Sequence, residues 1–294
     1  MTTKARVPVR RTAKLFIAGE FPRSESGRSY EVFSHDGRLL GRAARASRKD
    51  LRDAVRAARA AQPEWAGKTA YNRGQILYRV AELMEGRRSQ FESELADAGA
   101  KDPRRGVDAS IDRWVWYAGW ADKIGQLLGA TNPVAGPYFN FTIPEPTGVV
   151  GLVAPEQSSL LGLISRLAPP LVAGNAVVVI ASETRPLAAI TLTEVRATSD
   201  VPSGVVNVLT GLKDELVPVM AGHVDVDAID VWGVPDALRT DVELVAADNV
   251  KRLSRRPAGV TDARFDWLDD RATERPEWIA AFLEMKTVWH PIGV

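Results

Sequence analysis

The sequence predicts an α/β fold built on a doubly wound parallel sheet. Between Gly148 and Gly211, two longer segments of helical character separate three short apolar runs rich in β-branched residues: Val149–Ala154, Ala176–Ala181 and Val205–Leu209. Such continuously apolar runs are typical of parallel strands that helices cover on both faces. Ligands of these sheets bind beyond the carboxyl ends of the strands, so we look for function in Pro155–Ser159, Ser182–Pro186 and Thr210–Lys213.

Composition limits the class of protein. Of the 294 residues, 45% are hydrophobic and 26% are charged, as in ordinary soluble globular proteins. The net charge of +1 gives no general attraction to nucleic acid or to anionic membranes. The chain has no cysteine, which excludes disulfides and a thiol nucleophile of its own. The sequence shows no apolar run long enough to span a membrane and no apolar core of a signal peptide. We therefore expect a cytoplasmic protein with no membrane partner.

The amino-terminal part predicts mainly helices. Residues 1–14 are basic and are expected to form a disordered arm. Residues 15–32 alternate apolar and turn residues, which predicts a small hairpin. Ser47 followed by Asp50 predicts a capped helix that ends before Pro63. Apolar stripes predict further helices over 71–85, 89–98 and 107–128.

A β-arm is predicted over 131–146, where several prolines flank an alternating stretch. Its apolar positions indicate a partner surface and include Tyr138, Phe139, Phe141 and Ile143. Beyond Gly211 we expect a helix over 214–221 and a strand near 228–232. Residues 251–276 are highly charged and show no sustained period, which predicts a linker, and 277–294 form a carboxyl-terminal segment.

Several phrases of the sequence resemble the cofactor domain of the aldehyde dehydrogenase superfamily. They are Gly148-Val-Val-Gly-Leu-Val-Ala-Pro155, Ala173-Gly-Asn-Ala-Val-Val-Val179, Ser182-Glu183, Val201-Pro-Ser-Gly-Val-Val-Asn-Val-Leu-Thr-Gly211 and His223-Val-Asp-Val-Asp-Ala-Ile229. The resemblance implies a degenerate, Rossmann-like NAD-binding domain over 15–130 and 147–250, and an oligomerisation role for the arm. Residues 277–294 resemble the family's carboxyl-terminal oligomerisation segment, which adds Lys286, Thr287, Val288 and Trp289 to the interface. The chain is also similar to the Cys-free second module of two-module aldehyde dehydrogenases.

Most of the family's catalytic residues have no match. The family's catalytic Cys is absent, and its oxyanion-binding Pro-Trp-Asn-Phe phrase is matched by Pro155-Glu-Gln-Ser158, which makes Gln157 a vestigial candidate. The family's Glu-Leu-Gly-Gly phrase, which carries its general base, is matched weakly at Glu243. Too few residues separate Ala246 from Glu284 to hold the family's catalytic domain. The three histidines lack metal-ligand spacing, so no metal site is expected.

The resemblance implies an incomplete cofactor site. The family's ribose-binding Lys-Pro-Ser-Glu is Ile180-Ala-Ser182-Glu183 here, and Glu183 is read either as a nucleotide contact or as an acid at a helix amino terminus. Residues 236–240 are expected to be too short for the pyrophosphate-binding helix. We therefore expect that no cofactor is required and that any NAD binding is weak. The residual candidates for nucleotide contact are Pro155, Gln157, Ser182, Glu183, Gly211 and Gly233.

Two functions remain open. The first is a non-catalytic structural or regulatory subunit that is inactive alone and assembles with a full-length aldehyde dehydrogenase or with itself. The second is an NAD(H)-binding oxidoreductase component or sensor that acts on aldehydes with a catalytic Cys supplied by a partner. A non-functional remnant is disfavoured, because the strand-like patterns at 138–143 and 286–289 would serve no purpose without a partner.

Overall fold

Five parallel strands form the central sheet, in the order β10-β9-β6-β7-β8. The computed structural model describes residues 9–257 and 259–293. The strands of this sheet are β6 (Val149–Val153), β7 (Ala176–Ile180), β8 (Val206–Leu209), β9 (Ala228–Asp230) and β10 (Arg252–Ser254). From β6 the chain adds β7 and β8 on one side and then β9 and β10 on the other. The strand order therefore reverses between β6 and β9, which makes this pair the topological switch point.

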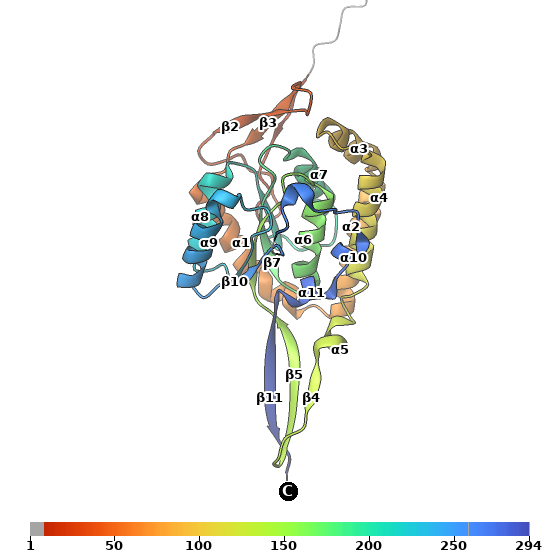
Figure 1. Cartoon of the computed structure of the whole chain (residues 1–294), viewed down its shortest axis with the longest axis vertical. Coiled ribbons are helices and arrows are strands. Elements are labelled where there is room, and N and C mark those ends of the chain that lie inside the picture. The colour runs from red at the N-terminus through yellow and green to blue at the C-terminus, as the bar shows by residue number, and fades with distance from the viewer. Residues whose placement is uncertain (1–8, 258, 294) are drawn as a thin grey trace, which may run out of the picture.

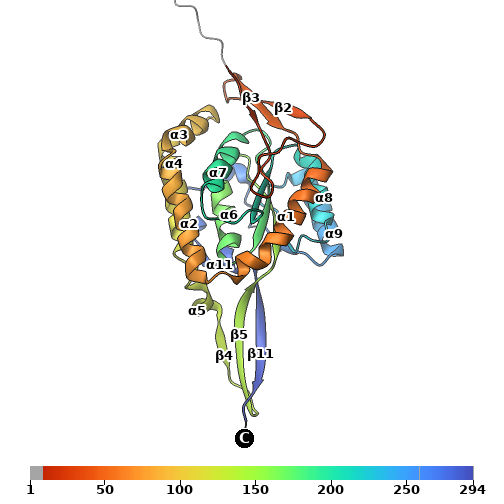
Figure 2. The same cartoon turned by 180° about the vertical axis from the view of Figure 1, so that it is seen from behind.

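Helices cover both faces of the sheet (Figures 1 and 2). They are α1 (Arg48–Gly67), α2 (Ala70–Glu85), α3 (Arg88–Asp97), α4 (Pro103–Ala118), α5 (Ile124–Leu128), α6 (Leu161–Val172), α7 (Leu187–Ala197), α8 (Lys213–Gly222), α9 (Asp236–Asp248), α10 (Asp270–Thr273) and α11 (Pro276–Ala280). Helices α1, α8 and α9 lie on one side of the sheet, and α2, α3, α4, α6 and α7 lie on the other.

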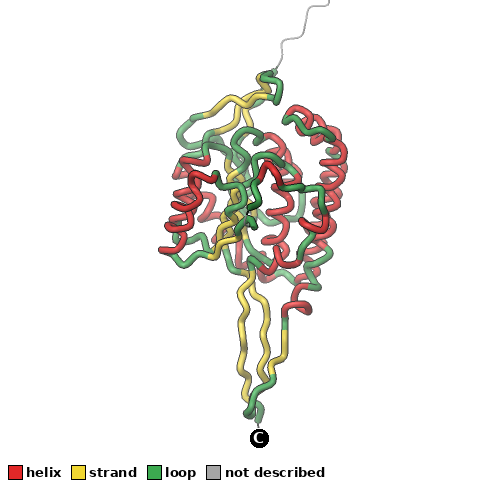
Figure 3. Tube along the Cα trace, viewed as in Figure 1, coloured by secondary structure: helices red, strands yellow, loops and turns green. Residues whose placement is uncertain are grey.

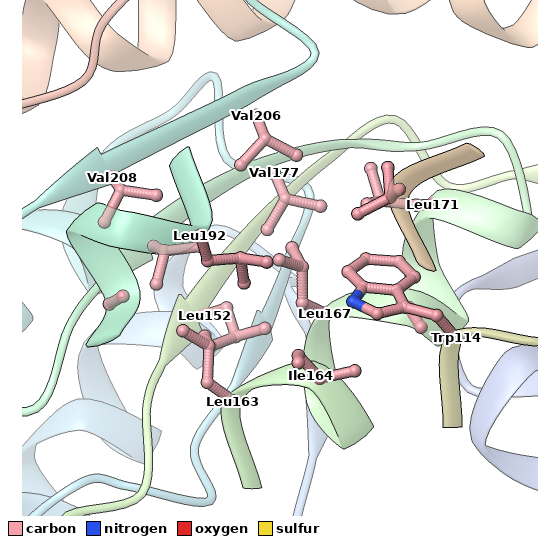
Figure 4. Close-up of a cluster of buried hydrophobic side chains, with 14 of the residues drawn as sticks. Trp114, Leu152, Leu163, Ile164, Leu167, Leu171, Val177, Leu192, Val206 and Val208 are labelled. Atoms are coloured by element: carbon pink, nitrogen blue, oxygen red, sulfur yellow. The ribbon is translucent and has the colours of Figure 1, made fainter. Parts of the chain in front are cut away.

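Strands β6, β7, β8 and β9 contribute side chains to two cores, which confirms the doubly wound pattern. Val150 and Leu152 of β6 face the core beneath α6, whereas Val149 and Val153 face the core beneath α1 and α8. Figure 4 shows the first of these cores, in which Trp114 of α4 lies with leucines of α6 beside strand valines. A strand buried on both faces needs apolar side chains at every position, which is why its sequence does not alternate.

The amino-terminal elements differ in three places from the sequence-based expectations. A tight antiparallel turn pairs Ile17 with Glu20 inside the range of the predicted hairpin. A second hairpin, not predicted, lies between β2 (Ser29–Phe33) and β3 (Leu39–Ala44), and β1 (Thr12–Ala13) pairs parallel to β3. The first helix keeps its predicted capping box at Ser47 but continues past Pro63 to Gly67. Packing holds this last turn, because Trp65 is fully buried and its indole N–H donates to the carbonyl of Leu171 (3.0 Å).

Other expectations need correction. The helix predicted over 107–128 is two helices, α4 and α5, separated at Gly119. The predicted linker 251–276 is an integrated part of the body, since it supplies β10 to the sheet and buries Trp267. Of the basic stretch 1–14, residues 1–8 lie outside the described residues and Thr12–Ala13 form β1.

A second sheet projects from the body as an arm, at the opposite end from β2 and β3 (Figures 1 and 3). It contains β4 (Ala130–Asn132), β5 (Tyr138–Pro146) and β11 (Leu283–Pro291) in the order β11-β5-β4. Strands β5 and β11 are antiparallel and stay paired from Pro146 and Leu283 out to Tyr138 and Pro291. The structure therefore joins the predicted β-arm and the predicted carboxyl-terminal strand into one sheet.

Candidate functional site

The loops that follow β6, β7, β8 and β9 meet at the carboxyl edge of the central sheet. The backbone N–H of Lys213, after β8, donates to the carboxylate of Glu183, after β7 (2.8 Å). The ammonium of Lys213 donates to the carbonyls of Ala154 (2.7 Å) and Gly233 (2.9 Å), after β6 and β9. This edge therefore brings together Ser182, Glu183, Gly211 and Gly233, as the strand pattern predicts.

Glu156 is the centre of the hydrogen-bond network at this edge. The loop after β7 gives it two backbone N–H groups, from Glu183 (2.9 Å) and Thr184 (3.3 Å). It also gives two hydroxyls, from Ser182 (2.8 Å) and Thr184 (3.0 Å). Lys213 completes the set with an ion pair to the same carboxylate. Although burial opposes ionisation of Glu156, the Lys213 charge and these hydrogen bonds outweigh it and lower its pKa below the usual range.

Lys213 is buried at the switch point. Its ammonium bridges the residues that follow β6 and β9, the two strands between which the sheet reverses its order. Ammonium groups are rarely buried without a counter-ion, and here Glu156 supplies the negative charge. The charged pair therefore lies at the switch point, which is where ligands of such sheets usually bind.

Gly233 allows the turn after β9 to approach β6 closely. A Cβ atom at this position would lie 2.0 Å from the carbonyl oxygen of Ala154 and 2.5 Å from that of Val153. Its backbone N–H donates to the Val153 carbonyl (3.0 Å). Only glycine leaves room for this contact, so Gly233 shapes the edge through its backbone.

Glu183 lies at the amino terminus of a helix, which agrees with one of its two interpretations and leaves the nucleotide contact a prediction. Its carboxylate accepts the N–H of Lys213, which is the first residue of α8. Tyr30 of β2 lies nearby with a buried hydroxyl that has no partner among the described residues. Burial and the charges of Glu183 and Glu156 raise the pKa of this phenol.

Gln157 is exposed at the rim of a cavity of about 630 Å³. The cavity lies beside the loop after β6, and its lining includes Arg105, Arg185 and Trp267. Asp262 closes one side, where its carboxylate accepts the backbone N–H groups of Glu156 (2.7 Å) and Gln157 (3.1 Å). The backbone of Gln157, which is the vestigial oxyanion candidate, is therefore held by a residue from the segment predicted to be a linker.

One prediction about the region after Gly233 is wrong. A helix does follow it, because α9 begins at Asp236 and runs to Asp248. Glu243, the vestigial general-base candidate, lies inside this helix and pairs with Arg255 (3.0 Å).

The predicted interface residues all lie in the arm, away from the carboxyl edge. They belong to β5 (Tyr138, Phe139, Phe141 and Ile143) and to β11 (Lys286, Thr287, Val288 and Trp289). Sequence reasoning missed the importance of Glu156, Lys213 and Asp262. Glu156 and Lys213 both lie within segments chosen for their place after a strand, but only the fold shows that they pair. Among the described residues, no group of acidic, histidine or cysteine side chains has a metal-binding arrangement.

Comparison with known proteins identifies relatives of this chain. The family model described as "Aldehyde dehydrogenase family" matches residues 21–260. Aldehyde dehydrogenase, cytosolic 1, of Elephantulus edwardii is 33% identical over 249 residues, which cover 82% of this chain and 49% of that protein. Cytosolic 10-formyltetrahydrofolate dehydrogenase of Pongo abelii is 34% identical and is matched over 84% of this chain and 28% of its own length. The chain thus spans half or less of these relatives.

Solved structures agree with these sequence relatives. HpcC from Thermus thermophilus superposes with a TM-score of 0.77 at 30% identity, over 83% of this chain and 48% of that one. An NAD+ complex of aldehyde dehydrogenase from Bacillus cereus gives a TM-score of 0.77 at 26% identity, over 83% of this chain and 50% of that one. No helix in the described part of the chain is long and apolar enough to span a membrane.

The NAD+ complex overturns the expectation that no cofactor is required. In the present structure Ser182, Glu183 and the amino end of α9 all follow strands of the central sheet. The donors of the Ser182–Thr184 loop point at Glu156. These donors are therefore already used by an internal carboxylate.

Proposed function

The chain belongs to the aldehyde dehydrogenase family, and from this premise we propose that it is a structural or regulatory subunit that assembles with a full-length aldehyde dehydrogenase. One observation carries the proposal, namely the exposed apolar surface of the arm. Phe139 is 49% exposed and Trp289 is 58% exposed, although both are large apolar side chains. Exposed aromatic clusters of this kind are typical of protein interfaces.

One face of the arm carries an apolar stripe along β5. Phe139, Phe141 and Ile143 are two residues apart along β5, so their side chains lie on the same face. The rings of Phe139 and Phe141 are 5.4 Å apart, and Val288 of β11 lies opposite Phe141. A partner sheet or helix that covered this stripe would bury aromatic area, which contributes strongly to association.

The other face of the arm combines polar and aromatic groups. Tyr138 and Trp289 pack edge to face with ring centroids 5.7 Å apart. Further along, the hydroxyls of Thr142 and Thr287 lie 2.9 Å apart and share a hydrogen bond. These cross-strand pairs keep the arm rigid, and a rigid surface loses less conformational entropy when it binds.

Replacing Phe139, Phe141 and Ile143 together with serine tests this proposal. We expect co-purification with a full-length aldehyde dehydrogenase to fall by more than about tenfold, because the apolar stripe is lost. A matched control replaces Tyr71 and Tyr78 of α2 with serine, since these side chains are also exposed but lie on the body. Association that is unchanged in the arm variant would contradict the proposal.

A second candidate function is binding of NAD(H) by the central domain. Helix α9 favours it, since the chain has a helix directly after the turn at Gly233, where the carboxyl edge of a doubly wound sheet can receive a pyrophosphate. In this function Glu183 would accept hydrogen bonds from ribose hydroxyls. An aldehyde-oxidising activity would then need a thiol from a partner, because this chain has no cysteine.

Calorimetric titration of NAD and NADH into the purified chain, up to millimolar ligand, tests the second candidate. We expect saturable heat with the unaltered chain and a loss of that heat in Glu183→Ala. Glu243→Gln is the matched control, because it removes a carboxylate on α9 that pairs with Arg255 away from the edge. The absence of both heat and thermal stabilisation by either nucleotide would rule out this function.

A further inference from the structure

Glu156 accepts hydrogen bonds in a pattern that suits a bound anion. Its two oxygens are met by two backbone N–H groups, two hydroxyls and one ammonium, contributed by Ser182, Glu183, Thr184 and Lys213. Successive backbone N–H groups beside hydroxyls and a lysine are the donors that proteins use to hold phosphate groups. We call this donor set the anion seat.

The anion seat is built into the body independently of Glu156. The Lys213 side chain is 2% exposed and is fixed by the carbonyls of Ala154 and Gly233. The Ser182 hydroxyl also accepts the N–H of Arg185 (3.0 Å), which closes the loop on itself. The donors are therefore held in place by contacts that remain when the carboxylate is removed.

The Glu156 side chain is less constrained than the seat that holds it. It is 28% exposed, whereas Lys213 is 2% exposed. The carboxylate thus reaches the seat from the solvent side, and its departure would open the seat to solvent. The backbone of Glu156 would stay in place, because its N–H is bound by Asp262 (2.7 Å).

We propose that the anion seat is a binding site for a phosphate group and that Glu156 is its internal occupant. The location supports this assignment, because Lys213 bridges β6 and β9 at the switch point, where ligands of such sheets bind. A phosphate-bearing ligand enters the seat by displacing the Glu156 carboxylate. The proposal deepens the second candidate function, on which it rests for the nature of the natural ligand, but the seat itself can be tested with inorganic phosphate.

Charge near the seat sets the expected strength of binding. Once Glu156 is removed, the Lys213 ammonium has no counter-ion within the seat, because the Glu183 carboxylate accepts the backbone N–H of Lys213 and not its ammonium. A phosphate would supply the missing negative charge. The residual Glu183 charge limits the gain, so we expect an increase in affinity of about one to two orders of magnitude.

The experiment compares phosphate binding by the unaltered chain and by Glu156→Ala. Calorimetric titration with inorganic phosphate measures the affinity, and thermal unfolding at increasing phosphate concentration measures the stabilisation. We expect Glu156→Ala to bind phosphate at least tenfold more tightly and to gain thermal stability as phosphate is added. In Glu156→Ala combined with Lys213→Met, the gain should disappear. Glu243→Gln, which alters a carboxylate outside the seat, should behave like the unaltered chain.

A second variant covers the case in which Glu156→Ala does not fold. Glu156→Gln keeps the length of the side chain but loses its charge, and it should bind phosphate at least threefold more tightly than the unaltered chain. Equal phosphate affinity in the unaltered chain and in whichever variant folds would overturn the proposal. Failure of the second candidate function would give a different result. In that case NAD and NADH would not bind, although phosphate would still bind more tightly to the variant than to the unaltered chain.

Discussion

Replacing Asp230 with alanine is expected to lower the free energy of unfolding by about 3–5 kcal/mol. Asp230, at the end of β9, forms an ion pair with Arg166 of α6, and both side chains are almost completely buried. Arg166 also donates to the hydroxyl of Ser254 (2.7 Å), at the end of β10. Without Asp230 a buried guanidinium would lose its counter-ion. Chemical denaturation followed by fluorescence of the nearby tryptophans measures the change.

Aromatic contacts around Arg166 add to the expected effect of this substitution. The Arg166 guanidinium carbon lies 4.9 Å from the ring centroid of Trp232 and 4.2 Å from that of Trp278, so the cation contacts two neighbouring aromatic rings. The ion pair therefore helps to hold the segment from β10 to α11 against the body.

A double variant, Arg166→Met with Asp230→Leu, should recover part of the lost stability, because it removes both charges together. An Asp230→Ala protein as stable as the unaltered chain would contradict this account.

Replacing Gly233 with alanine should destabilise the protein by about 3 kcal/mol, at the upper end of the usual cost of overpacking. The added Cβ would lie 2.0 Å from the Ala154 carbonyl oxygen, and backbone cannot yield as a flexible side chain can. The same carbonyl accepts from Lys213, so a shift would also disturb the buried ammonium. Thermal unfolding measures the loss of stability.

Gly125 provides the control for this substitution. It lies in α5, and a Cβ atom there would meet no neighbouring atom within 4 Å. Gly125→Ala should leave stability unchanged or raise it by up to about 1 kcal/mol, because alanine favours a helix more than glycine does. If the two variants had equal stability, the close approach at Gly233 would not be the reason for its glycine.

Local pattern predicted the central domain well. The apolar runs that became β6, β7 and β8 were identified because burial on both faces demands apolar residues at every position. The capping box of Ser47 and Asp50 was found because it needs only residues three positions apart. The end of that helix was missed, because packing of Trp65 against α6 carries α1 beyond Pro63.

The segment 251–276 shows where local pattern fails. It looks like a linker because it is charged and has no period, yet Arg252–Ser254 add a strand beside β9. Its position depends on contacts with distant residues, above all the hydroxyl of Ser254 on Arg166. A three-residue strand at the edge of a sheet is too short to produce a recognisable pattern.

By itself the sequence determined the family, the doubly wound sheet, the absence of a thiol and the edge of the sheet at which to look for a site. Each of these depends on residue types or on spacing along the chain. Only the tertiary structure decided that Glu156 is bound by Lys213 and the Ser182–Thr184 loop, and that β5 and β11 form one arm. These contacts join residues far apart in the chain, and hydrogen bonds and ion pairs depend on distances that only folding sets.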